Sequence, residues 1–343
     1  MQREFFAHFT FLHARSDIQR AAMDFLLGKG KVPDGLRHLA DVVDPLARID
    51  LLAQALLTSY KDYARAGSRR EGGGLPELYR SQAFQNAMDA RYKQMNALGL
   101  IPALPDLDAL PVGSFALYFT FTLRAPYISK DDVILHILDN PVRKDRIFRL
   151  PMVTSTTWKG VLRAAIRESK GWTDDHPDVL RLFGETREDE AGHAGRLIFY
   201  PTFFTRISLE VINPHDRQSN AGKQPIYFES VPAGAQGTFS LLYVPFDLIG
   251  EDGNKIRNQA LADLQRVAEG LRALFLTYGF SAKRTSGYGV AEETVTNGVL
   301  TGRFPGPAAS APTQPWPTWT FGSFTELVNI SARIAQQLQG GTR

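Results

Sequence analysis

The sequence contains no cysteine among its 343 residues. This absence excludes disulfide bonds, thiolate metal sites and cysteine nucleophiles, and it is typical of proteins from a reducing compartment. No stretch approaches about 18 uninterrupted apolar residues, and the opening MQREFFAHFTF carries charges where a secretory signal would be apolar. The sequence therefore predicts a cytoplasmic protein that does not contact a membrane.

Neither sign of charge is in large excess. Lys and Arg number 39 and Asp and Glu 36, so the net charge is only +3. Because 43% of the residues are hydrophobic and 22% are charged, the composition is that of a folded protein. At about 100 to 200 residues per domain, the length fits one large domain or two smaller ones.

The motifs of several enzyme classes are missing. The chain has no GxxxxGK[ST], HExxH or GxSxG, and its seven histidines lack metal-ligand spacing. What remains is an acidic cluster, Asp131, Asp132 and Asp139, with His136 nearby. Such carboxylates can hold a divalent ion, or accept a proton when an RNA 2′-hydroxyl attacks its own phosphate. In the alternative interpretation, Asp139 only begins an Asp-Asn-Pro turn.

The first third of the chain has helical spacing. Between residues 17 and 98, apolar residues return every three or four positions, as at Leu36, Leu39, Val43, Leu46, Ile49 and Leu52. GSRREGGG, at 67–74, interrupts this pattern as a loop, and LGLIPALPDLDALP ends it as a connector with a boundary near 105–112. Residues 4–12 fit a strand and a helix equally well.

The pattern then changes to a period of two. FALYFTFTL, from Phe115 to Leu123, predicts a half-buried strand. A helix around Trp158, strands after Gly195 and Gly237, a helix over about 256–278 and a strand after Gly289 follow in this order. The order predicts an α+β fold of the ferredoxin-like β-α-β-β-α-β type, with both helices on one face of the sheet and a ligand on the other.

Beyond Gly302 the composition changes again. FPGPAASAPTQPWPTW is too rich in proline and alanine for a regular element, and a short amphipathic helix follows it. We therefore expect three regions: a helical region at 1–110, a ferredoxin-like domain at 111–303, and a linker with a terminal helix at 304–343.

Positive charge is concentrated between residues 143 and 170. Eight basic and two acidic residues give this window a charge of +6. Lys159, Arg163 and Arg167 recur every four positions and would form one row on a helix, whose start at Thr154–Thr157 offers hydroxyl and N–H groups to a phosphate. A solvated helix face is the alternative.

Two further segments are candidates for contact with a polynucleotide. The loop GFSAKRTSGYG, at 279–289, places Lys283 and Arg284 among glycines and small hydroxyl residues. The polar stretch at 213–234 carries Arg217 and Lys223, and it predicts a protruding hairpin or finger. A structural turn and an ordinary surface excursion are the alternatives.

Five segments together resemble a known family. DNPVRKD, PMVTSTTWKGVLR, LFGETREDEAGHAGRLIFYP, FESVPAGAQGTFSLLYV and GFSAKRTSGYG are similar, in this order, to motifs of the RAMP proteins of type III CRISPR effector complexes. The nearest likeness is to the repeated backbone subunit that lines the guide RNA. The resemblance implies a modified ferredoxin-like (RRM-like) fold, and it implies guide-RNA (crRNA) binding, pairing with target RNA and contact with neighbouring RAMP, large and small helical subunits.

The resemblance also assigns residues. The segment at 213–230 would be the thumb that opens the guide–target duplex. Asp139 matches the aspartate that cleaves RNA and would hold the divalent metal, with Mg²⁺ as the expected ion, if the protein is catalytic. The implied RNA-binding residues are Arg143, Lys144, Thr154, Ser155, Thr156, Lys159, Arg163, Arg217, Lys223, Lys283, Arg284, Ser286, Gly287, Tyr288 and Gly289.

The chain departs from the family pattern at three places. APYISKDDVILHIL replaces the usual glycine-rich stretch before the aspartate, Thr154–Thr157 replaces Gly-Ser-Ser, and residues 1–110 have no counterpart in the backbone subunit. The extra helices could resemble those of a capping subunit or a fused small subunit. A non-catalytic capping subunit and a nuclease that processes repeat RNA alone are the alternative functions.

Overall fold

The computed structural model describes residues 2–68, 70, 72–133, 135–185, 194–213, 225–305 and 316–339. The chain forms two compact units. A helical unit comprises 1–98, 128–151 and 205–232, and a sheet unit comprises 99–127, 152–204 and 233–343. The units differ from the linear division expected at 110/111 and 303/304, because two inner segments of the expected RNA-binding domain pack with the N-terminal helices.

The helical unit confirms the helical spacing of the first 98 residues. Its elements are α1 (Gln2–His8), α2 (Ser16–Leu26), the 3-10 helix η1 (Arg37–Asp41), α3 (Pro45–Leu52), the 3-10 helix η2 (Ala53–Leu57), α4 (Lys61–Ala66), α5 (Gly74–Arg80), α6 (Gln82–Ala97) and the hairpin strands β5 (Ser208–Ile212) and β6 (Ile226–Ser230). The ambiguous start is therefore helical.

One position of the expected apolar stripe in this unit is wrong. Val43 is 79% exposed, because the chain leaves η1 before it and starts α3 after it. Asp44 caps α3 by accepting a hydrogen bond from the Leu46 N–H, and Pro45 occupies the first turn. The Asp44-Pro45 pair thus marks the start of a new helix, and the stripe is divided between η1 and α3.

The sheet unit is built around one five-stranded antiparallel sheet. Its strands run in the order β3 (Leu197–Phe199), β7 (Gln236–Tyr243), β1 (Phe115–Leu123), β8 (Ala291–Gly302) and β9 (Thr318–Ser323). The remaining elements are β2 (Met152–Val153), α7 (Ser155–Lys170), α8 (Pro177–Phe183), β4 (Thr202–Phe203), the 3-10 helix η3 (Phe246–Leu248), α9 (Gly253–Ala273), the π-helix η4 (Leu274–Tyr278), the 3-10 helix η5 (Arg284–Ser286) and α10 (Phe324–Gln339).

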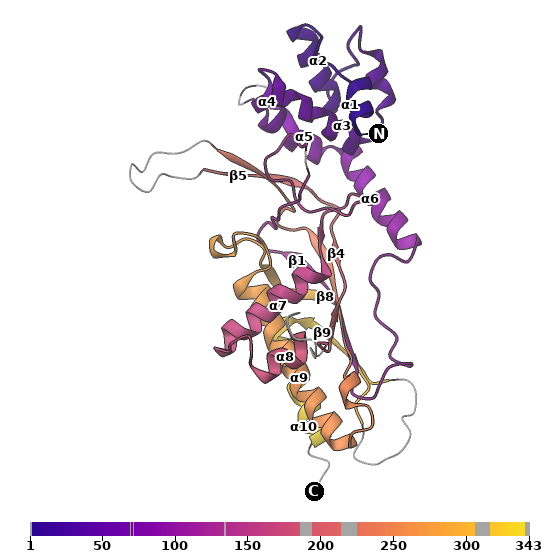
Figure 1. The fold of residues 1–343 in the computed structure, drawn as a ribbon, viewed down its shortest axis with the longest axis vertical. Coiled ribbons are helices and arrows are strands. Elements are labelled where there is room, and N and C mark those ends of the chain that lie inside the picture. Colours follow the sequence, from indigo (N-terminus) through magenta and orange to yellow (C-terminus); the bar gives the residue numbers. More distant parts are fainter. Residues whose placement is uncertain are drawn as a thin grey trace, which may run out of the picture. The chain divides into compact units, whose positions relative to one another are not determined.

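The ferredoxin-like prediction is confirmed by two orders. Along the chain the core elements follow as β1, α7, β3, β7, α9 and β8, and in the sheet the four strands lie in the order β3, β7, β1, β8. One face of the sheet packs against α7, α9 and α10 (Figure 1). Alternation along β1 directs Phe119 and Phe121 to this face, where the Phe119 ring lies 5.5 Å from that of Phe275 and 5.4 Å from that of Phe324. The aromatic residues of the strand therefore build the core.

Two strands differ from the sequence interpretation. GRLIFYPTFF divides into β3 and β4, which pair with different strands, and the expected linker ends in a fifth strand, β9. In β9 only Phe321 is fully buried. Because pairing with β8 and not an apolar pattern fixes β9, local sequence gave no signal for it.

The other face of the sheet is not as open as expected. The connector crosses part of it, and Leu107 is buried against Ala116, Leu242 and Val244. The backbone oxygen of Ala103 accepts a hydrogen bond from the Ser240 hydroxyl at 3.4 Å. The connector is therefore part of the sheet unit.

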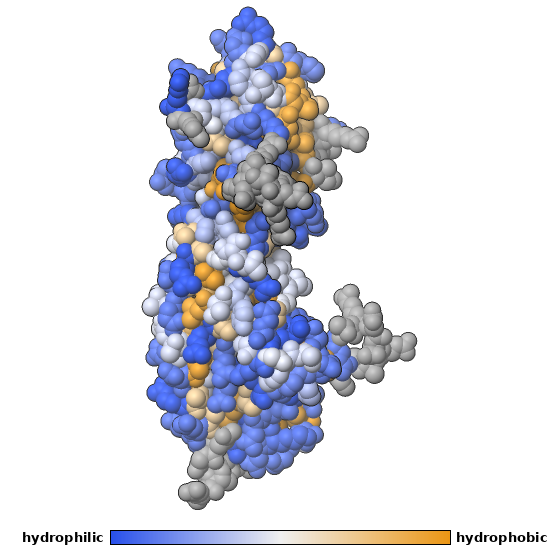
Figure 2. All heavy atoms as spheres, turned by 90° about the vertical axis from the view of Figure 1, so that its left-hand side faces the viewer, coloured by the Kyte–Doolittle hydropathy of each residue, from blue (hydrophilic) through white to orange (hydrophobic). Residues whose placement is uncertain are grey.

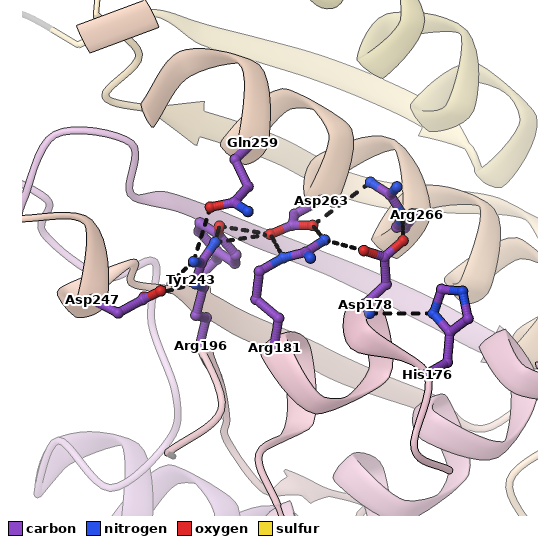
Figure 3. A network of polar contacts seen from close by, with 9 residues as sticks. All are labelled: His176, Asp178, Arg181, Arg196, Tyr243, Asp247, Gln259, Asp263 and Arg266. Carbon is purple, nitrogen blue, oxygen red and sulfur yellow. Dashed lines mark hydrogen bonds and ion pairs between the residues drawn. The ribbon is translucent and has the colours of Figure 1, made fainter. Parts of the chain in front are cut away.

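A buried polar network fixes α8 and α9 to the sheet (Figure 3). Asp263 of α9 is fully buried and accepts hydrogen bonds from Arg181 at 2.6 and 3.1 Å and from the Tyr243 hydroxyl at 2.8 Å. Arg196 joins Asp263 at 3.3 Å and pairs with Asp247. Burial, with the Asp263 charge adding to it, raises the pKa of Tyr243. The matched charges make this network structural.

Within the described part of the chain, none of the helices combines the length and hydrophobicity that crossing a membrane requires.

Candidate nucleic-acid interface

Helix α7 begins with a cluster of hydroxyl groups. Thr154 is its N-cap and accepts a hydrogen bond from the Thr157 N–H at 3.1 Å. The Thr154 hydroxyl also lies 2.9 Å from that of Thr156, which is exposed, and Ser155 is half-buried. The first turn thus presents a polar, hydroxyl-rich end, as the sequence predicts.

One side of α7 is apolar and the opposite side is basic. Trp158, Leu162, Ala165 and Ile166 are buried. On the basic side, Arg163 and Arg167 pair with Asp174, both at 3.0 Å, and Lys170 pairs with Glu269 at 2.6 Å. Lys159 is exposed and has no ion pair within the described ranges. Lys159 is therefore the cation of this row that is open to an added phosphate.

Backbone hydrogen bonds close the base of the loop at 279–289 and tie it to Pro126. The Phe280 N–H donates to the Gly289 oxygen at 3.0 Å, and the Gly289 N–H donates to the Pro126 oxygen at 2.8 Å. Gly289 has φ +72°, and a Cβ there would lie 2.3 Å from the Ser281 Cβ. Only glycine fits this closure.

Closure of the loop projects its middle into solvent. Lys283, Arg284, Ser286 and Gly287 are exposed, and Tyr288 is half-buried. The Ser286 and Gly287 N–H groups donate to the oxygens of Lys283 and Arg284, both at 2.9 Å. The loop is thus a compact cationic tip rather than an extended chain.

The loop and the start of α7 are neighbours. The ring of Trp158, in the first turn of α7, lies 4.7 Å from that of Phe280, at the base of the loop. The side of the molecule that carries α7 in Figure 1 faces the viewer in Figure 2, where most of the surface is hydrophilic. The structure therefore brings together the two segments that the sequence assigned to a polynucleotide.

Asp139 lies in the helical unit and is accessible. Its side chain is 55% exposed, and its Oδ1 lies 3.0 Å from Nη2 of Arg65 in α4. Arg65 is buried, with a side chain only 5% exposed. The residue that the resemblance selects thus combines an exposed carboxylate with a fixed guanidinium beside it.

A second, fully buried carboxylate supports the Asp139 loop. Glu229 of β6 accepts hydrogen bonds from the Tyr79 hydroxyl at 2.7 Å, the Val142 N–H at 3.0 Å and the Lys144 ammonium. Its own N–H donates to the Asn140 oxygen at 2.9 Å. These contacts anchor the DNPV segment to the hairpin.

The charges around Glu229 are balanced. Burial alone would raise the pKa of Glu229, but the charges of Lys144 and His136 lower it below its ordinary value. Burial lowers the pKa of His136. The Lys144 side chain is 10% exposed and is engaged by Glu229, so Lys144 is not part of the exposed cationic surface.

The carboxylate cluster expected from the sequence is not assembled. Asp131 pairs with Arg143 at 3.5 Å and accepts a hydrogen bond from the Lys144 N–H at 3.2 Å. The described residues contain no group of three or more His, Asp or Glu side chains placed to hold a metal ion. Asp139 has a guanidinium as its neighbour, so these side chains do not fit a divalent ion by themselves.

The expected finger at 213–230 is a hairpin at its base. β5 and β6 pair antiparallel from Ser208 opposite Ser230 to Ile212 opposite Ile226. Arg217 and Lys223 lie outside the described residues. Whether this hairpin acts as a thumb stays a prediction.

Sequence reasoning missed Arg65, Tyr79 and Glu229. Arg65 is one basic residue in a short charged helix, and Tyr79 continues an ordinary apolar spacing. Glu229 lies in the FESVPAG motif. The sequence signal for its buried role is that it is a single acidic residue in an otherwise apolar strand.

Comparison with known proteins gives one family. A model described as the RAMP superfamily matches residues 71–292. The CRISPR system Cms endoribonuclease Csm3 of Mycobacterium tuberculosis (strain ATCC 25618 / H37Rv) is 29% identical over 180 residues, which cover 44% of this chain and 73% of the relative. Csm3 of Streptococcus thermophilus is 29% identical over 163 residues, with the same coverage of both chains.

Solved structures also resemble the chain. A chain of the type III-B Cmr-beta complex bound to cognate target RNA covers 81% of this chain and 98% of its own length, with 14% identity and a TM-score of 0.43. A chain of a CRISPR RNA-guided surveillance complex has 15% identity and a TM-score of 0.37, and it covers 67% of this chain and 85% of its own length.

Proposed function

The chain belongs to the RAMP superfamily, and on this premise we propose that it is a guide-RNA-binding subunit of a type III CRISPR effector complex. The observation that carries the proposal is the packing of Trp158 on Phe280, which sets the hydroxyl-rich start of α7 beside the cationic loop. Relatives named as Csm3 support the same assignment.

The proposed surface would bind the sugar-phosphate chain. Lys159, Lys283 and Arg284 supply charge, and the loop backbone and the Thr154–Thr156 hydroxyls supply hydrogen bonds. Arg163 would join after exchanging Asp174 for a phosphate. Sequence selection would be left to pairing between the guide and a complementary target.

Charge reversal of Lys159 tests this surface. We expect Lys159→Glu to weaken guide-RNA binding and to reduce the slope of log K against log salt by about 0.7 for each lost contact with a single strand. The measurement is a salt titration of binding by fluorescence anisotropy. Lys170→Glu, which alters a lysine paired with Glu269, is the matched control. An unchanged slope in Lys159→Glu would support the solvated-face interpretation.

The proposed complex also defines partners and location. The protein would act in the cytoplasm with crRNA, target RNA, neighbouring RAMP subunits, a large subunit and a small helical subunit. We expect the purified protein to carry short RNA of uniform length. Cleavage of precursor guide RNA by the isolated protein would instead support the repeat-processing nuclease.

We propose further that Asp139 cleaves the paired target RNA. The Asp139 carboxylate, exposed toward solvent, would take the proton of an RNA 2′-hydroxyl as that oxygen bonds to the adjacent phosphorus. The bond from phosphorus to the 5′-oxygen then breaks, that oxygen takes a proton from water, and Asp139 returns its proton to the solvent, which leaves a 2′,3′-cyclic phosphate and a 5′-hydroxyl. An unstacked target nucleotide would supply the in-line geometry.

An Asp139→Ala complex given complementary RNA tests the cleavage proposal. We expect loss of cleavage with unchanged target binding, measured on labelled RNA with magnesium and with EDTA. The two conditions determine whether a divalent ion is required. Persistent cleavage with the same pattern would leave the non-catalytic capping subunit, in which Asp139 only shapes a turn.

A further inference from the structure

Arg65 lies outside the segment that matches the family model, yet it contacts the candidate catalytic loop. Its guanidinium is buried, although it extends from the short helix α4. A buried cation is costly unless it is paired and hydrogen-bonded. The groups that pair with Arg65 therefore indicate what this residue does.

The contacts of Arg65 fix the guanidinium at two atoms. Nε donates to the Ile137 backbone oxygen at 2.7 Å, and Nη2 donates to Oδ1 of Asp139 at 3.0 Å. Its Cζ lies 5.8 Å from the centre of the Tyr227 ring of β6. Because the guanidinium is planar and rigid, a fork bound to both the loop backbone and the carboxylate sets the direction of that carboxylate.

The pair is asymmetric in exposure, at 5% for Arg65 and 55% for Asp139. The protein thus holds the cation inside and presents the carboxylate outside. The contact with Arg65 uses Oδ1, so Oδ2 is the oxygen that the pair leaves for a proton from RNA.

We infer that Arg65 is a positioning residue for cleavage at Asp139, supplied by the N-terminal helices. This inference rests on the proposed function. It gives those helices a role inside the chain: they complete the catalytic loop. The Arg65 fork, bound to the Ile137 oxygen and to Asp139, holds the loop and its carboxylate in one orientation.

The test uses the full chain in its guide-loaded complex and measures single-turnover cleavage at saturating target RNA. Arg65→Gln keeps a polar side chain but removes the charged fork, and we expect the cleavage rate to fall about 10- to 100-fold. Target affinity should not change, because Arg65 is buried. Arg65→Lys keeps the charge without the planar fork, and it should restore part of the rate.

Arg91→Gln is the matched control, because Arg91 pairs with Asp44 at 2.8 Å in the same unit. This variant should cleave at the wild-type rate. If Arg65→Gln lowers the thermal unfolding midpoint of the complex more than Arg91→Gln does, its cleavage rate does not separate positioning from folding. The cleavage rate of the folded Arg65→Lys variant is then the test. A wild-type rate in Arg65→Lys would then overturn the inference.

Asp139→Ala separates the two proposals. If it is inactive while Arg65→Gln cleaves at the wild-type rate, the positioning role is wrong and the cleavage function stands. If Asp139→Ala itself cleaves normally, the cleavage function fails, and the role of Arg65 fails with it.

Discussion

At the scale of single residues, Glu229 shows how a buried charge organises the candidate catalytic loop. It accepts hydrogen bonds from a tyrosine of α5, a loop N–H and the Lys144 ammonium, and all of these belong to the helical unit. Burial opposes its ionisation, and the nearby charges of Lys144 and His136 outweigh burial, so its pKa is lowered. The loop is therefore held by electrostatics as well as by packing.

This lowered pKa predicts acid sensitivity. Because the folded-state pKa of Glu229 lies below its ordinary value of 4.5, the pairing contributes full stability above pH 4.5 and loses it as the pH falls toward the folded-state value. Chemical denaturation at a series of pH values should show the free energy of unfolding falling below pH 4.5.

Glu229→Gln should remove this component. The substitution leaves Lys144 without its counter-charge, and we expect a loss of about 3 kcal/mol near neutral pH. Glu77→Gln is the matched control, because Glu77 pairs with Lys29 at an exposed site, and it should cost less than about 1 kcal/mol. Equal effects of the two substitutions would contradict the role of burial.

At the scale of elements, the loop at 279–289 depends on one close approach. Gly289 and Gly287 both have positive φ, but a side chain at Gly289 would meet Ser281, whereas nothing lies within 4 Å of a Cβ at Gly287. Alanine at Gly289 therefore combines a steric clash with an unfavourable positive φ, whereas alanine at Gly287 has only the unfavourable φ.

Gly289→Ala should open the base of the loop and weaken guide-RNA binding. Gly287→Ala is destabilised only by its positive φ, by about 1 to 2 kcal/mol. This variant should therefore retain more affinity for guide RNA than Gly289→Ala. The binding titration described for Lys159 and thermal unfolding measure both effects. If Gly287→Ala impairs binding as much as Gly289→Ala, closure at Ser281 is not what shapes the loop.

Elements with a strong pattern were predictable, and elements fixed by neighbours were not. β1 matches its expected bounds because every second residue is a large apolar one, and α7 follows from its cap and apolar stripe. In contrast, β9 depends on β8, and only the fold shows that the hydroxyl-rich Thr154 turn lies beside the loop that begins at Phe280. Sequence spacing also could not show that Asp174 and Glu269 engage three of the four cations of α7.

At the scale of the whole molecule, the two units are interleaved along the chain. The segments 128–151 and 205–232 leave the sheet unit and find their partners in the N-terminal helices. Arg149, for example, makes two hydrogen bonds of 2.7 Å to Asp50 of α3. The expected domain at 111–303 therefore lacks groups on which its own loop depends.

This interleaving predicts how a fragment behaves. In a chain of residues 111–343, hydrogen exchange should become fast over the described parts of the two segments, 128–133 with 135–151 and 205–213 with 225–232, while β1, β7 and β8 keep their protection. Residues 1–110 added in trans provide the control and should restore slow exchange in the two segments. Full protection without them would mean that the linear division at 110/111 holds for folding.

By itself, the sequence determined the ferredoxin-like order of elements, the hydroxyl-rich start and basic row of α7, the glycine loop and the resemblance that selected Asp139. Each of these features is read from local or periodic patterns and from their order along the chain, without knowledge of which distant residues meet. The tertiary structure alone decided that Arg65 meets Asp139, that Glu229 engages Lys144, and that Lys159 rather than Arg163 stays open. Each of these outcomes depends on which charges burial brings together, and residues far apart in the chain fix that only when it folds.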